Sequence, residues 1–119
     1  MKAELFHAEQ EGDVLLIRPQ HNVSSLADAD LMGETSRLCA QLAQSEVKHV
    51  VVDFAPVDYF GSLMLEALRT LWNTLHAAGG KMALCNVSPV GREILEIARF
   101  DRLWPICDSC EEAKRVVRS

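Results

Sequence analysis

A single serine, Ser62, stands where an extended segment gives way to a predicted helix, and its hydroxyl can do chemistry in two ways. A hydroxyl at a helix N-terminus can accept a hydrogen bond from the free backbone N–H groups of the first turn. The same position lies at the surface and at the positive end of the helix dipole, where a phosphate group is favoured. The residues alone therefore leave two interpretations of Ser62 open, a helix cap and a site of phosphorylation.

Two of the four cysteines, Cys107 and Cys110, are separated by only two residues. Such a spacing occurs in redox-active pairs and in one half of a zinc site. A structural zinc site needs a second pair of ligands, and the four histidines supply no matching doublet. We therefore predict no metal site, and two alternatives remain for Cys107 and Cys110: a small redox enzyme, or small, partly buried thiols.

Two aspartates, Asp53 and Asp58, follow the apolar run Val50–Val52. Ligand sites of α/β proteins gather at strand ends, and carboxylates there can bind Mg²⁺. A phosphotransfer receiver also needs acids from several strand ends and a lysine on a later strand, whereas Lys81 precedes its strand. Asp53 and Asp58 are therefore interpreted as a solvated strand end and a turn former.

The chain offers no other motif for catalysis. A serine-hydrolase elbow requires G-x-S-x-G, but the residues from Phe60 to Met64 read FGSLM. Neither of the glycine-rich phosphate-binding motifs, G-x-x-x-x-G-K-[ST] and G-x-G-x-x-G, follows a predicted strand. The sequence thus predicts a binding module rather than an enzyme, and no cofactor is expected.

Length and charge narrow the class of protein further. A chain of 119 residues is expected to form one domain, residues 1–119, around a single core. The net charge is −5 and the basic residues are scattered, so nucleic acid is an unexpected partner. No apolar run approaches the length of a membrane span, and the first ten residues contain acids. We expect a cytoplasmic protein; the sequence does not indicate its oligomeric state.

The elements that must position these residues alternate along the chain. The residues Glu11, Gly12 and Asp13 favour a hairpin turn, and capping boxes at Ser25 and Ser109 favour two helix starts. We predict strands at residues 3–9, 13–18, 48–53, 81–86 and near 106, and helices over residues 25–44, 62–78, from 88 onward and from 109 onward. This order predicts an α/β fold with a mixed, mostly parallel sheet of four to five strands, an N-terminal hairpin and about four helices.

Apolar residues at helical spacing identify the faces that the helices are expected to bury. In the first predicted helix these are Leu31, Leu38 and Leu42. In the helix that follows Ser62 they are Met64, Leu68, Leu71, Trp72 and Leu75. Ser88 and Pro89 are typical of a helix start, and in that helix the expected buried residues are Val90, Ile94 and Ile97. In the last helix they are Cys110, Ala113 and Val117.

Residues 47–106 resemble a STAS domain, the fold of bacterial anti-sigma factor antagonists. The stretch VVVDFAPVDYFGSLMLEAL, residues 50–68, matches the family pattern without a gap: an apolar strand that ends in Asp, a short turn, and a motif of the type F-I-D-S-S-G-L that opens a helix. The similarity continues through the Gly-Gly-Lys turn, MALCNVSP, REILEIARFDRLWPI and a terminal helix beginning CEEA. The N-terminal hairpin and first helix fit the same order of elements.

The resemblance implies a function and a set of site residues. Ser62 falls on the serine that a partner kinase phosphorylates in anti-sigma factor antagonists. That kinase is itself the anti-sigma factor, and the unphosphorylated antagonist binds it and so frees the sigma factor. The surface implied to bind the partner comprises Asp58, Tyr59, Phe60, Gly61, Ser62, Leu63, Met64 and Leu65. Gly61, Leu63 and Met64 replace the usual Asp, small polar residue and Gly of the motif, and Leu63 and Met64 are expected to enlarge an apolar docking surface.

A second function is compatible with the same resemblance. STAS domains also serve as docking subunits of other assemblies, such as lipid-transport ATPases or stress-signalling particles, in which the surface docks without phosphorylation. The two functions differ in whether a kinase-like partner modifies Ser62.

Overall fold

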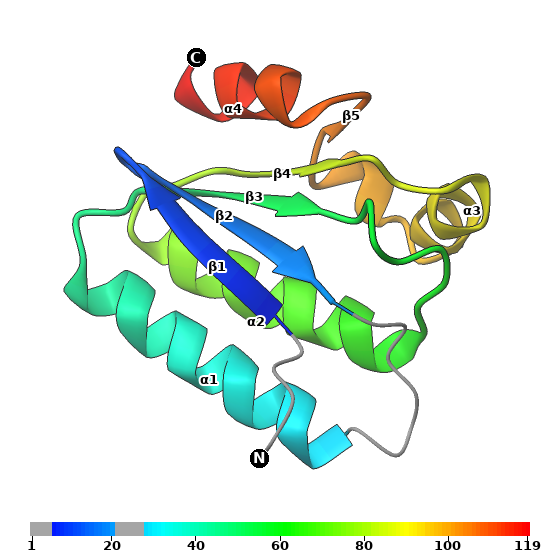
Figure 1. The fold of residues 1–119 in the computed structure, drawn as a ribbon, viewed down its shortest axis with the longest axis horizontal. Coiled ribbons are helices and arrows are strands. Elements are labelled where there is room, and N and C mark those ends of the chain that lie inside the picture. The colour runs from blue at the N-terminus through cyan, green and yellow to red at the C-terminus, as the bar shows by residue number, and fades with distance from the viewer. Residues whose placement is uncertain (1–5, 21–27) are drawn as a thin grey trace.

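The computed structural model describes residues 6–20 and 28–119, and these residues form a five-stranded sheet with helices on both faces (Figure 1). The strands are β1 (Phe6–Glu11), β2 (Val14–Pro19), β3 (His49–Asp53), β4 (Met82–Cys85) and β5 (Ile106–Cys107). The helices are α1 (Asp28–Gln44), α2 (Ser62–Ala77), α3 (Pro89–Ile97), the 3₁₀ helix η2 (Phe100–Arg102) and α4 (Cys110–Arg118). Among these, no helix is both long and apolar enough to cross a membrane.

The sheet has the order β1-β2-β3-β4-β5, so each strand lies beside its neighbour in sequence. β1 and β2 pair antiparallel through the predicted hairpin, with Glu11 opposite Val14 and Gly12 at a φ of 62°. The three remaining pairings are parallel. The predicted fold class is therefore confirmed, and the mostly parallel arrangement brings the C-terminal ends of β2, β3 and β4 to one edge.

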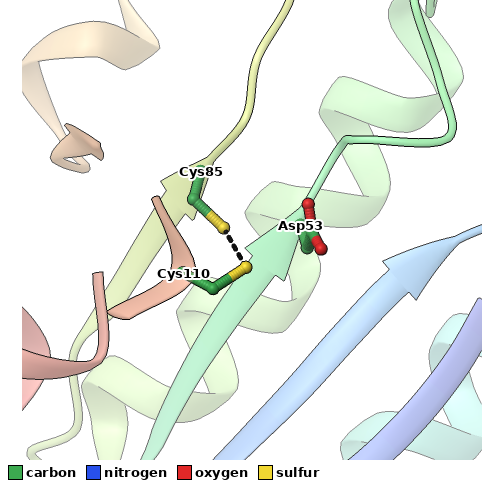
Figure 2. A group of neighbouring side chains, drawn as sticks. All are labelled: Asp53, Cys85 and Cys110. Atoms are coloured by element: carbon green, nitrogen blue, oxygen red, sulfur yellow. Dashed lines mark hydrogen bonds between the residues drawn. The ribbon is translucent and has the colours of Figure 1, made fainter. Parts of the chain in front are cut away.

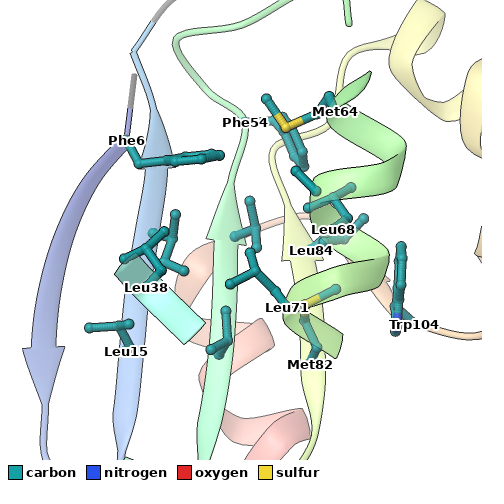
Figure 3. Packing of buried hydrophobic residues seen from close by; sticks show 14 of the residues in the cluster. Phe6, Leu15, Leu38, Phe54, Met64, Leu68, Leu71, Met82, Leu84 and Trp104 are labelled. Atoms are coloured by element: carbon teal, nitrogen blue, oxygen red, sulfur yellow. The ribbon is translucent and has the colours of Figure 1, made fainter. Parts of the chain in front are cut away.

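Side chains alternate between the two faces of each strand, as the two-residue period of a strand requires. One face packs against α1 and α2 and contributes Leu15, Ile17, Val50, Val52, Met82 and Leu84 to the larger core cluster (Figure 3). The other face, with Val14, Leu16, Val51, Ala83 and Cys85, packs against Ala113 and Val117 of α4. β2, β3 and β4 are apolar on both faces because helices cover both.

Helix α2 buries the face that its sequence predicts. Met64, Leu68, Leu71 and Leu75 are buried, and Trp72 is half-buried against the same cluster. The helix begins at Ser62, and Gly61 occupies the capping position without a side-chain hydrogen bond. The interpretation of Ser62 as the N-cap is therefore wrong: Ser62 is already helical, and the carbonyl of Gly61 accepts the N–H groups of Met64 and Leu65 at 3.1 and 3.3 Å.

Helix α3 departs from its predicted orientation. The expected buried residues Val90 and Ile97 are 50% and 77% exposed, and Ile94 is half-buried. The helix instead buries Gly91 and Leu95, one position further along. Gly91 has no side chain, so the spacing of large apolar residues could not reveal the face that makes the closest contact.

The predicted helix starts at Ser88 and Ser109 are confirmed. Each serine hydroxyl accepts the N–H three residues later, from Gly91 at 3.0 Å and from Glu112 at 3.1 Å. In α4, Ala113 and Val117 are buried and Cys110 is half-buried, as predicted. Ser25, the expected cap of α1, lies outside the described residues.

Candidate functional site

The loop between β3 and α2, residues 54–61, presents Ser62 at the C-terminal edge of the parallel strands. The loop starts at Asp53, whose carboxylate accepts the N–H of Ala55 at 2.9 Å. A turn follows in which the N–H of Val57 donates to the carbonyl of Phe54 at 2.9 Å. The path of the chain from the buried strand to Ser62 is thus fixed by hydrogen bonds at its beginning.

Phe60 anchors the far end of the same loop. Its ring is 1% exposed and stacks on the ring of Phe54, with centroids 4.9 Å apart. Gly91 of α3 lies against this ring, since a Cβ at position 91 would be 3.0 Å from Phe60 Cε2. Phe60 was expected on the partner-binding surface, but it is part of the core because the apolar ring has a closely fitting site there.

Met64 is also misplaced in the expected docking surface. It is fully buried, as its place in the apolar stripe of α2 requires, so it does not enlarge an exposed apolar patch. Leu63 and Leu65 are half-buried and pack partly against the core. A partner approaching this edge meets Ser62, which is exposed, between the buried Phe60 and Met64.

Exposed residues are found both on the loop that precedes Ser62 and on helix α3, whose start is hydrogen-bonded to that loop. In the loop, Asp58 and Tyr59 are exposed, and Tyr59 is 54% exposed despite its large ring. Helix α3 adds its outward side chains, Val90 and Ile97, and the partly exposed Ile94; we call these three residues the α3 apolar face. The helical spacing of these three apolar residues is evident in the sequence. Because buried faces of helices have the same spacing, the three residues were predicted to be in the core.

Ser88 joins the start of helix α3 to the loop. The Ser88 hydroxyl donates to the carbonyl of Asp58 at 2.7 Å while it accepts the N–H of Gly91. The start of α3 is therefore held against the loop two residues away from Phe60. We call the exposed residues Asp58, Tyr59, Ser62, Val90 and Ile97 the docking face.

Asp53 is a buried anchor rather than the solvated strand end that its position suggested. It is 3% exposed, and its oxygens accept hydrogen bonds from Arg18 Nε and Asn86 Nδ2, each at 3.0 Å. Burial raises the pKa of the carboxyl, but the hydrogen bonds from Asn86, the N–H of Ala55 and Arg18 outweigh it, so the pKa lies below its usual value. Asp53 therefore holds a negative charge that is fully partnered.

The cysteines meet in a pair that the sequence did not indicate. Cys110 Sγ lies 2.9 Å from Cys85 Sγ, at the end of β4, and Asp53 completes a cluster of three donor atoms within 4.8 Å of one another (Figure 2). Cys107 packs with the apolar residues beneath α4. The sulfur that faces Cys110 thus belongs to Cys85 instead of to Cys107, the partner that the C-x-x-C spacing suggested. Strand pairing places Cys85 beside Cys107, and the turn to α4 then carries Cys110 back over Cys85.

This cluster has the donor types of a metal site, but its carboxylate is already in use. Asp53 Oδ1 accepts from Ala55 and Asn86, and Oδ2 accepts from Arg18. A cation at this point would have to share the carboxylate with these donors and deprotonate both thiols. Burial raises the pKa of both Cys85 and Cys110, which opposes that deprotonation.

Comparison with known proteins gives a consistent family. The STAS domain family model matches residues 6–113. BtrV of Bordetella bronchiseptica, named as an anti-sigma factor antagonist, is 31% identical over 101 residues, which cover 85% of this chain and 84% of BtrV. Among solved structures, one named as an anti-sigma factor antagonist from Thermotoga maritima gives a TM-score of 0.83 at 18% identity, over 96% of this chain and 95% of that one. The Bacillus cell fate determinant SpoIIAA in its phosphorylated form gives a TM-score of 0.66 at 20% identity, over 93% and 98% of the two chains.

Proposed function

The chain belongs to the STAS domain family, and from this premise we propose that it is a non-catalytic antagonist of an anti-sigma factor. It acts in the cytoplasm, where it binds that partner, a serine protein kinase, through the docking face. BtrV, which is 31% identical over 101 residues, is named as an anti-sigma factor antagonist. One observation carries the proposal: the exposed Ser62 hydroxyl stands on a helix start whose two flanks, Phe60 and Met64, are locked in the core.

A rigid, half-apolar face suits protein recognition. Exposed aromatic and aliphatic side chains next to a polar group are typical of the centre of a protein interface. Tyr59, Val90 and Ile97 supply the apolar part, and Ser62 supplies a small hydroxyl that a partner can cover without burying a charge. Because Phe60 and Ser88 fix the loop and α3, little conformational entropy is lost when the partner binds.

We propose further that the partner phosphorylates Ser62 and that this modification ends binding. A phosphate at the start of α2 stabilises the folded chain by roughly 0.3 to 1 kcal/mol through the helix dipole. The same charge buried without a partner under the anti-sigma factor costs several kcal/mol. Phosphorylation therefore leaves the fold intact and weakens the complex. SpoIIAA, which shares the fold, has a structure in a phosphorylated form.

A second function, docking in an assembly that does not phosphorylate Ser62, is favoured by Gly61. The family motif has Asp at this position, and an acid there normally neighbours the modified hydroxyl. No atom lies within 4 Å of a Cβ built at Gly61, so the fold itself does not require glycine there. The absence of the acid then reflects the function of this surface, docking without phosphorylation, instead of a packing constraint.

Capture of the tagged protein from its own host, with intact-mass analysis of the bait, separates these functions. The proposal predicts that a kinase-like anti-sigma factor is captured and that a fraction of the bait carries one phosphate. Ser62→Ala bait must lose the phosphate, and Ser36→Ala, at an exposed serine on α1, must keep it. A transporter ATPase as the captured protein, with unmodified bait, would establish the second function in place of the first.

A further inference from the structure

We propose that Cys85 and Cys110 are an oxidation site, at which a hydroperoxide converts the two thiols into a disulfide that joins β4 to α4. This proposal does not rest on the docking face or on the proposed partner. Its two sulfur atoms come from segments that are 25 residues apart in the sequence and are held 2.9 Å apart by the fold (Figure 2).

The backbone on each side of the pair is fixed. Cys85 is the last residue of β4, buried, and its register against Cys107 of β5 places its side chain beneath α4. Cys110 is the first residue of α4, and the cap at Ser109 sets the direction of that helix start. The Sγ–Sγ distance of 2.9 Å exceeds the length of a disulfide bond, ~2.05 Å, by less than about 1 Å. Rotation of the side chains, without a change of fold, is therefore expected to close the bond.

The two sulfurs could instead be metal ligands, but the hydrogen bonds that Asp53 already accepts make a metal site less favourable than a disulfide. Both carboxylate oxygens already accept hydrogen bonds, one of them from the guanidinium of Arg18. A disulfide leaves these three hydrogen bonds in place and removes only the hydrogen bond between Cys110 and Asp53. It also removes the two S–H groups, whereas a metal would require both to be buried as thiolates.

The oxidation proceeds in two balanced steps. The Cys110 thiolate, the more accessible of the two, attacks one peroxide oxygen; an S–O bond forms and the O–O bond breaks. The leaving group takes a proton: hydroxide becomes water, and the alkoxide of an organic peroxide becomes an alcohol. Cys85 then attacks the sulfenic sulfur of Cys110; the S–S bond forms, and the sulfenic oxygen leaves as water with the Cys85 proton. Two thiols lose one electron each, and the peroxide accepts both. A dithiol reductant reverses the reaction.

The surroundings of the two cysteines make the oxidation slow and determine the order in which the cysteines react. Burial and the neighbouring Asp53 carboxylate raise the pKa of Cys110, while the hydrogen bond with Cys85 and the charge of Arg18 act in the opposite direction. Cys110 also stands at a helix N-terminus, where a thiolate is stabilised. Cys85 is buried and reacts second, when the sulfenic acid is already within reach.

The test uses the full chain, reduced and exchanged into chelator-containing, mildly alkaline buffer, then treated with hydrogen peroxide. We expect the intact mass to fall by two hydrogens and two of the four thiols to disappear from a titration under denaturing conditions. Trypsin should then release residues 82–92 linked to residues 103–114, and a dithiol should separate them. Cys107→Ala is the matched control, since it removes the other cysteine of the second peptide and must retain the link.

Cys85→Ala and Cys110→Ala must each lose the link. Cys110 is half-buried at a helix start, so Cys110→Ala tests the proposal even if Cys85→Ala fails to fold. A bond between Cys107 and Cys110, or retention of all four thiols after peroxide treatment, would overturn the proposal. A parallel sample is prepared without chelator. Thiols that stay unreactive in that sample until chelator is added, and that rebind Zn²⁺ with a stoichiometry of one, would also overturn the proposal, because the pair would then be a metal site.

Discussion

The hydroxyl of Ser88 joins the start of α3 to the loop that presents Ser62, by donating to the carbonyl of Asp58 at 2.7 Å. The same oxygen caps α3 by accepting the N–H of Gly91 at 3.0 Å. One side chain thus performs two tasks, and each task has a measurable consequence.

Replacing Ser88 by alanine removes both hydrogen bonds. We expect the free energy of unfolding to fall by about 1 to 2 kcal/mol, the usual cost of losing a cap, and affinity for the partner to fall as well, because α3 is released from the loop. Ser109→Ala removes a comparable cap from α4 and is the control: it should cost similar stability and no affinity. Urea unfolding and titration calorimetry measure the two effects; equal affinity losses in the two variants would contradict this role of Ser88.

Gly91 permits the close contact between α3 and the loop. A Cβ at this position would lie 2.9 Å from Val87 Cγ1 and 3.0 Å from Phe60 Cε2. Gly91→Ala should therefore destabilise the chain by about 1 to 3 kcal/mol through overpacking. Gly33→Ala, within α1 and with no atom within 4 Å of its Cβ, should instead stabilise it by about 0.5 to 1 kcal/mol. Thermal unfolding of both variants checks the opposite signs, and a stabilised Gly91→Ala would show that α3 does not pack as described.

The α3 apolar face is predicted to contribute to binding but little to folding. Ile97 is 77% exposed, so Ile97→Glu should change the free energy of unfolding by less than about 0.5 kcal/mol. The same substitution introduces a charge into the interface and should weaken partner binding about tenfold or more. Gln41→Glu on the exposed side of α1 adds the same charge elsewhere and should leave binding unchanged. If both variants bind equally well, α3 lies outside the interface.

The acid side of the stability profile should depend on Asp53. Its pKa in the folded chain lies below the usual 3.8, so the folded state favours the ionised carboxylate. The resulting stabilisation is complete above the pKa of the unfolded chain and is lost as the pH falls through the lower pKa of the folded chain. Asp53→Asn should lower the free energy of unfolding at neutral pH. The difference from the natural chain should be smallest at the acid end of the pH series. Urea unfolding across an acid pH series tests this, and a constant difference between the two proteins would contradict it.

Gly61→Asp restores the acid of the family motif at a position with open space. Because Asp is at least as good a helix cap as Gly, we expect a small gain of a few tenths of a kcal/mol. If the acid assists modification, the variant should also be phosphorylated faster than the natural chain by the captured kinase. Unchanged phosphorylation with the expected gain in stability would assign Gly61 a structural role only.

Much of the fold followed from the sequence because the relevant signals are local. The buried run at Val50–Val52, the stripe from Met64 to Leu75 and the caps at Ser88 and Ser109 each depend on residues a few positions apart. They fixed the order of the elements, and with it the edge of the sheet where Ser62 lies.

The details of the site depended on contacts that spacing does not encode. Phe60 is buried because Gly91, distant in sequence, leaves room for its ring, and Asp53 is buried because Arg18 and Asn86 supply partners. The pairing of Cys110 with Cys85 needs the strand order and the turn into α4 together. For α3, the apolar spacing was correctly recognised, but nothing in it distinguishes a buried face from an exposed one.

The most direct test of the central claim compares the affinity of the captured anti-sigma factor for the natural chain and for Ser62→Asp, with Ser36→Asp as the control. If Ser62 lies in the interface, a buried unpaired charge costs several kcal/mol, so the affinity should fall about a hundredfold or more, while Ser36→Asp binds normally. The fold of each variant is verified by its unfolding transition. Full affinity of Ser62→Asp would contradict both the docking face and the phosphorylation switch.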